Sequence, residues 1–163
     1  MSEALRSVLI GTMGLGAVAA VALYLTVSRG GVGGSAAELG RTLRWGALAT
    51  LLQAVHFAEE LLGGFERRFP ELLGLAPWPA SFFVTFNLLW LAIWGLSLWG
   101  LAGRHRAALF PLWFLAIAGL VNGLAHPLLS LLAGGYVPGL FTSPLGAIAG
   151  LFLLARLSTI TRS

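Results

Sequence analysis

The chain contains no cysteine and no lysine. Without cysteine it has no disulfides, thiolate metal sites or cysteine nucleophiles, and without lysine it cannot form a Schiff base through a lysine amine. Charge of either sign is also scarce, because only 10% of the residues are charged, against about 25% in a soluble globular domain. With 58% hydrophobic residues among 163, we predict that lipid surrounds much of the chain.

Five long apolar runs are typical of membrane-spanning helices. The predicted fold is therefore all-α, an integral membrane bundle of five transmembrane helices. The first run exceeds the roughly 7–15 apolar residues of a signal-peptide core, so it is interpreted as a retained helix. Its Gly11, Gly14 and Gly16, and the pair Gly146 and Gly150 in the last run, predict close helix–helix approach. The runs are residues 7–27, 45–65, 80–102, 107–133 and 140–157.

The arginines predict how the chain is oriented. They stand singly or in pairs at the ends of the apolar runs, which indicates membrane flanks and excludes nucleic acid as a partner. Arg6, Arg67 and Arg68 fall on one side of the predicted spans. The positive-inside rule therefore places the N-terminus outside and the C-terminus in the cytoplasm of a cell-membrane protein. The larger group on the other side is Arg29, Arg41, Arg44, Arg104, Arg106, Arg156 and Arg162.

The predicted domain organisation follows from these spans. An N-terminal transmembrane helix occupies residues 1–30, and a flexible glycine-rich linker follows at 31–42. The four remaining spans form a membrane domain over residues 43–157. Residues 158–163 form a cytoplasmic tail.

Strongly polar residues inside the spans mark a candidate site, because burying them in lipid is costly. At about 1.5 Å of rise per residue from the flanking arginines, they converge in the extracytoplasmic half of the bundle. Helical spacing also places His56 and Glu60 on one face, as it does Asn122 and His126. The full set is Gln53, His56, Glu59 and Glu60, then Asn87, then Asn122 and His126, then Tyr136, Thr142 and Ser143 after the fourth run.

Three motifs follow one another along the chain: HFAEE at 56–60, NGLAHP at 122–127 and YVPG at 136–139. Together they resemble the HXXEE family of small membrane proteins with four transmembrane helices, over about residues 43–156. The resemblance implies that the first run is an addition, to which we can assign only packing or targeting. It brings no substrate, although the family's residue pattern has suggested an enzyme. The family's motif residues correspond to His56, Glu59, Glu60, His126, Tyr136, Pro138 and Gly139.

The first hypothesis is a metal-dependent membrane enzyme. His56 and His126 would supply imidazoles and a glutamate, preferably Glu60, a carboxylate, a ligand set that suits zinc or iron. The other glutamate would be the general base. The substrate would be lipidic or amphiphilic, since the site lies within the membrane. Asn87 or Asn122 would orient the ligands or stabilise an oxyanion.

Other hypotheses stay open. The same histidine and glutamates could perform metal-free acid/base catalysis, such as isomerisation of a lipid, with a hydroxyl from Tyr136, Thr142 or Ser143. The cluster could instead bind or transport a ligand, an ion or protons without catalysis, or hold a haem between two histidines. A purely structural hydrogen-bond cluster would also account for these residues. The sequence does not predict an oligomeric state.

Overall fold

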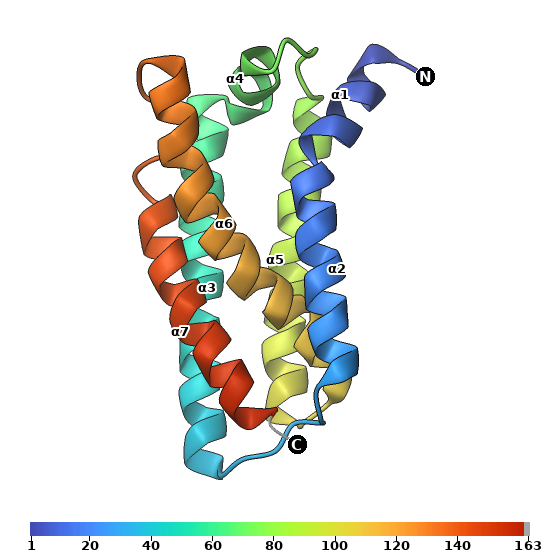
Figure 1. Cartoon of the computed structure of the whole chain (residues 1–163), viewed down its shortest axis with the longest axis vertical. Helices are drawn as coiled ribbons and strands as arrows, with labels where there is room; N and C mark the ends of the chain where they lie inside the picture. The colour runs from blue at the N-terminus through green and yellow to red at the C-terminus, as the bar shows by residue number, and fades with distance from the viewer. Residues whose placement is uncertain (162–163) are drawn as a thin grey trace.

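The computed structural model describes residues 1–161, which form helices and contain no strand. The predicted all-α class is therefore confirmed. α6 occupies the centre of the bundle, where it packs against α2, α3, α5 and α7 (Figure 1). In chain order the elements are α1 (Glu3–Gly11), α2 (Met13–Ser28), α3 (Ala36–Gly63), α4 (Phe65–Leu72), α5 (Ala80–Ala102), the 3₁₀ helix η1 (Arg106–Ala108), α6 (Leu109–Ala133) and α7 (Ser143–Ile160).

Within residues 1–161, three segments are long and apolar enough to cross a membrane: α5, Arg106–Ala133 and α7. The first run forms a bent pair, α1 and α2, which meet at 45° and would make a fourth span if counted as one. α3 has 28 residues, but its charged and polar residues lower its hydropathy below that of these three. The five-span count and the orientation therefore stay predictions. In Figure 1 the start of α1 and the end of α7 lie at opposite ends of the molecule.

The non-helical stretch before α3 is shorter than the predicted linker, because residues 36–42 belong to the helix. α3 begins at Ala36 because Ser35 and Glu38 form a capping box that satisfies backbone N–H groups at the helix start. The preceding glycines are held as well: Arg104 donates to the carbonyls of Gly33 and Gly34 at 2.9 and 3.0 Å. The segment between α2 and α3 thus contacts the turn after α5 through Arg104.

The C-terminal boundary also differs from the prediction. α7 continues to Ile160, so the first residues of the predicted tail belong to the helix. Residues 162–163 of that tail lie outside the described part of the chain.

A short helix, α4, replaces the predicted end of the second span. Gly64 adopts φ +74°, which only glycine accommodates easily, and ends α3 at Gly63. Pro70 has no N–H, so it leaves the carbonyl of Glu66 free inside α4. The backbone N–H of Trp78 donates to that carbonyl at 2.8 Å. This bond folds the proline-rich segment back onto α4.

Glycines set the distance between α6 and α7, as predicted for Gly150, whereas a Cβ atom at Gly146 would itself meet nothing within 4 Å. A Cβ atom added at Gly119 would lie 2.9 Å from the carbonyl oxygen of Gly146. One added at Gly150 would lie 2.6 Å from the carbonyl oxygen of Ala116. The two backbones therefore touch through positions that no larger residue could occupy.

The same prediction is wrong for Gly14 and Gly16 on α2. A Cβ atom at either position would meet nothing within 4 Å, because α2 does not press against a neighbour there. Gly11 does have a close neighbour, since a side chain there would collide with the indole of Trp78.

Candidate functional site

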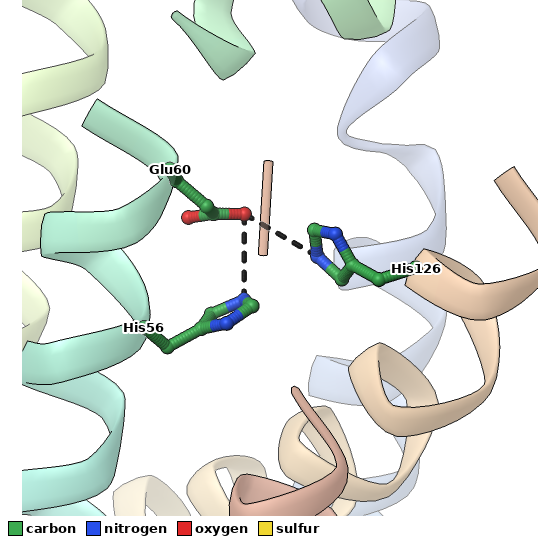
Figure 2. A group of neighbouring side chains, drawn as sticks. All are labelled: His56, Glu60 and His126. Atoms are coloured by element: carbon green, nitrogen blue, oxygen red, sulfur yellow. Dashed lines mark ion pairs between the residues drawn. The ribbon is translucent and has the colours of Figure 1, made fainter. Parts of the chain in front are cut away.

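His56, Glu60 and His126 meet in the interior of the bundle (Figure 2). His56 and Glu60 lie one turn apart on α3, and His126 reaches them from α6. The Nε2 atoms of both histidines lie 3.4 Å from the same oxygen, Oε1 of Glu60. The exposed fractions of the three residues are only 2%, 6% and 3%. The structure thus brings together the three residues predicted as metal ligands.

The two imidazoles pack edge to face, with ring centroids 4.7 Å apart and planes at 89°. A bis-histidine haem would need the macrocycle between the two rings. That space is taken by Glu60 Oε1 and by the ring contact itself. The arrangement of the two imidazoles and Glu60 therefore does not fit a haem held between the histidines.

Glu59 points to the loop between α6 and α7 instead of the histidines. Its Oε1 accepts hydrogen bonds from the Tyr136 hydroxyl at 2.9 Å and from the Phe141 N–H at 3.2 Å. Its Oε2 accepts from the Thr142 N–H at 2.9 Å and from the Thr142 hydroxyl at 2.6 Å. Four donors thus occupy this carboxylate, and through it α3 holds the loop in place.

Thr142 connects Glu59 to His56. Its hydroxyl has one proton, which it donates to Glu59, so its oxygen accepts from His56 Nδ1 at 2.8 Å. A neutral His56 protonated at Nδ1 has a free lone pair on Nε2, the atom that faces Glu60. This is the arrangement by which a hydrogen bond to one imidazole nitrogen orients a metal-ligating histidine.

Of the two asparagines predicted for the site, Asn122 lies next to the His/Glu cluster and Asn87 lies away from it. The Asn122 amide nitrogen lies 3.4 Å from His56 Nε2, next to the cluster. The Asn87 amide nitrogen donates to the backbone carbonyl of Phe83 at 3.0 Å, one turn back on α5. Asn87 therefore does not touch the histidines, although it lines the same cavity as Glu60, Asn122 and His126.

The YVPG loop packs directly on the two imidazoles. Gly139 has φ +94°, and a Cβ atom there would lie 2.5 Å from His126 Nδ1 and 2.7 Å from His56 Cε1. Pro138 sits equally close to α3, because a Cβ atom at Gly63 would lie 2.5 Å from its ring. The loop therefore seals the cluster on one side, and only glycine allows this contact.

The donor set fits a metal ion. Two ligand atoms about 2.05 Å from a tetrahedral zinc lie about 3.3 Å apart, close to the 3.4 Å between Glu60 Oε1 and each Nε2 atom. The lone pair of His56 Nε2 faces a carboxylate oxygen, an arrangement that repels unless a proton or a metal ion lies between them. The buried Nδ1 of His126 has no hydrogen-bond partner among the described residues. The other ring nitrogen of His126, Nε2, is therefore the one that faces a polar group, the Glu60 carboxylate.

A cavity of about 200 Å³ adjoins the cluster. Its polar side carries Gln53, Glu60, Asn87, Asn122 and His126, from three different helices. The opposite side is aromatic and comes mainly from α5, with Trp78 and two phenylalanines of α4. Residues 11–15 of α1 and α2 complete the wall. The aromatic side chains from α5 are Phe82, Phe83, Phe86, Trp90 and Trp94.

Several of these contributions could not be assigned from the sequence. Thr142 was one of three candidate hydroxyls, and its position between Glu59 and His56 depends on the path of the loop. Nothing in the sequence predicted that α1 and α2 would contribute to the cavity wall, because the residues they contribute are glycine, threonine and leucine. The aromatic residues of α5 repeat at helical spacing, a pattern equally typical of lipid-facing residues.

The comparisons with known proteins agree with the motifs. A family model described as "Protein of unknown function with HXXEE motif" matches residues 47–154. No curated protein and no solved structure matches the chain. The matched segment includes His56, Glu59, Glu60, His126 and the YVPG loop, and it leaves α1 and α2 outside. The chain therefore belongs to the HXXEE family.

Proposed function

We propose that the protein is a membrane enzyme whose centre is formed by His56, Glu60 and His126. The convergence of two imidazole nitrogens on one buried carboxylate oxygen, at 3.4 Å each, carries the proposal. Two histidines and one carboxylate form the ligand set of many catalytic zinc and non-haem iron sites. When bound, such an ion supplies Lewis acidity toward a water molecule or a substrate carbonyl. The reaction we propose is accordingly hydrolytic.

The remaining residues have distinct proposed roles. Asn122 lies beside His56 Nε2 and borders the cavity, so its amide donates to a substrate oxygen that reaches the centre. Asn87, whose amide nitrogen donates to Phe83, offers its amide oxygen further along the same cavity. Glu59 and Tyr136 are positioning residues, because they hold the loop and Thr142 and do not touch the cluster.

The proposed substrate is lipidic or amphiphilic. The cavity combines a polar side at the cluster with an aromatic side, as a molecule with one polar and one apolar end would require. The five-span arrangement with the N-terminus outside, which we retain as part of the proposal, would put this cavity in the extracytoplasmic half of the membrane.

Metal-free acid/base catalysis, such as lipid isomerisation, is the second candidate, and one observation favours it. Glu60 Oε1 is equally distant from both Nε2 atoms, so a proton can pass between the carboxylate and either imidazole. This candidate uses the same three residues without an ion.

Metal content separates the two candidates. The protein, purified without chelator, is analysed by inductively coupled plasma mass spectrometry beside His56→Ala and His126→Ala. His105→Ala is the matched control, because His105 lies in the exposed turn before η1. Near-stoichiometric zinc or iron in wild type and in His105→Ala, lost in the other two variants, would support the metal enzyme. Folded wild-type protein without metal would contradict it and leave acid/base catalysis as the function to test.

A further inference from the structure

The helix pair α1 and α2 lies outside the family match but forms part of the cavity beside the cluster. Gly11, Thr12, Gly14 and Leu15 line the same cavity as the aromatic residues of α5. The bend of 45° between the two helices falls within this stretch. A segment that has no part in the His/Glu cluster therefore shapes the space beside it.

The exposed residues that line the cavity, Gly14 and Val121, belong to α2 and α6, which places its mouth between these two helices. In Figure 1, α6 crosses the molecule toward the lower end of α2, so the two helices meet there and diverge above. At the closed end, Arg106 donates to the carbonyls of Thr26 and Val27 at 3.0 and 2.9 Å. At the open end, Gly14 and Val121 are both exposed and both line the cavity.

The surroundings of this mouth are apolar. Leu124 and Leu128 follow Val121 on the outer face of α6, with exposed fractions of 77% and 57%. Side chains of this kind on the outside of an apolar helix would face hydrocarbon in a membrane. A molecule that enters between α2 and α6 would therefore come from the lipid phase.

The size of the cavity limits what it can hold. Its volume of about 200 Å³ lies below the roughly 300–1,000 Å³ of pockets that enclose a drug-sized ligand. This volume matches part of one hydrocarbon chain better than the two acyl chains of a phospholipid. The polar end of that chain would meet Glu60, Asn122 and His126, and its apolar part would lie against Phe86 and Trp90.

We propose that the substrate of this centre is a single-chain amphiphile that enters from the lipid between α2 and α6, and that Gly14 determines which chains fit. The inference rests on the proposed function, because it names the substrate class of the same site. We assign the selectivity to Gly14 because it lines the cavity and nothing lies within 4 Å of a Cβ atom built there. A larger side chain at this position would take up cavity space without displacing a neighbouring residue.

Photolabelling tests this proposal. The full-length protein in lipid nanodiscs is irradiated with a long-chain primary alcohol that carries a diazirine near its apolar end, and labelled residues are mapped by tandem mass spectrometry. We expect label on Phe86 and Trp90, with background label on the outward-facing Leu88 and Leu89 of α5. Gly14→Leu should lower the cavity label about tenfold or more relative to that background, the scale on which an apolar pocket discriminates by size.

Gly16→Leu is the matched control, because Gly16 is also an open, exposed glycine of α2 but does not line the cavity. It should leave the cavity label unchanged. Val121→Phe narrows the mouth from α6 and should also lower the label, while Leu124→Phe should not. Label confined to the outward-facing residues of the wild type, or equal cavity label in Gly14→Leu and Gly16→Leu, would overturn the proposal.

This readout is independent of the proposed chemistry. Labelling needs neither metal nor turnover. Label on the cavity residues of a protein that contains no metal would contradict the metal-enzyme proposal and support the proposed binding site. If the three ligands bind metal but the cavity residues are not labelled, only the proposed binding site is contradicted.

Discussion

His56 Nδ1 lies 2.8 Å from Thr142 Oγ1, and this contact determines which imidazole nitrogen is available to the centre. Thr142 in turn donates to Glu59 at 2.6 Å. The second glutamate of the HFAEE motif, Glu60, touches the histidines directly, whereas the first acts through Thr142 of the loop before α7. The two adjacent acids therefore have different tasks.

Replacing Thr142 tests this connection. Thr142→Val removes the acceptor of His56 Nδ1 and one donor to Glu59 while keeping nearly the same shape. We expect metal affinity to fall about 10–100-fold, as for other partners that orient a ligating histidine. The free energy of unfolding should fall by about 1–3 kcal/mol, because a buried polar group loses its partner. Thr142→Ser keeps the hydroxyl and should retain most of both quantities in metal titration and detergent melts. Equal losses in the two variants would contradict the connection.

Gly139 should tolerate no side chain. Gly139→Ala places a Cβ atom against both imidazoles and keeps a strained φ of +94°. Overpacking and backbone strain together should cost about 2–4 kcal/mol of stability. Gly135→Ala, in the same loop, meets nothing within 4 Å and is the control. Thermal unfolding followed by circular dichroism in detergent compares the two, and a similar melting temperature for both would refute the packing of the loop on the histidines.

The α6–α7 contact predicts a difference between two glycines of one motif. Gly150→Ala pushes a methyl group against the backbone carbonyl of Ala116, whereas Gly146→Ala points into open space. We expect a loss of about 1–3 kcal/mol for the first variant, because a backbone carbonyl cannot move aside. The second should behave like the wild type in the same melts. A reversed order would show that the two helices pack in another register.

The Tyr136 hydroxyl should ionise at a higher pH than an ordinary tyrosine. Burial, and then its hydrogen bond to Glu59, raise the pKa of the Tyr136 phenol above its usual value of 10.0. Because the folded protein favours the neutral phenol, its contribution to stability is fully present below pH 10 and is lost as pH rises through the raised pKa. In a Tyr24→Phe background, phenolate absorbance near 295 nm reports Tyr136 alone. Adding Glu59→Gln should shift that titration toward lower pH, and no shift would argue against the Tyr136–Glu59 bond.

The sequence predicted the helical class and the helix Ala80–Ala102, because long apolar runs leave few alternatives. Spacing on one helix likewise placed His56 and Glu60 together. The separation of Glu59 from Glu60 could not be predicted, since both lie about one turn from His56. Their difference arises from where the loop of Tyr136 and Thr142 returns to α3, a tertiary contact that no local pattern encodes.

Two features followed from hydrogen bonding that only the structure reveals. α4 forms despite Pro70 because Trp78 satisfies the carbonyl that the proline leaves free. Before α3, Arg104 binds the carbonyls of two glycines. In both cases a residue distant in sequence stabilises a segment whose own sequence is typical of a loop.

The wall formed by residues 11–15 and the cluster formed by α3 and α6 belong to separate stretches of the chain, and only the second lies within the family match. A change in the helix pair can therefore reshape the cavity without altering a single residue of the His/Glu centre. The shape of the cavity and the chemistry of the centre can therefore be changed independently in this chain, the first through residues 11–15 and the second through α3 and α6.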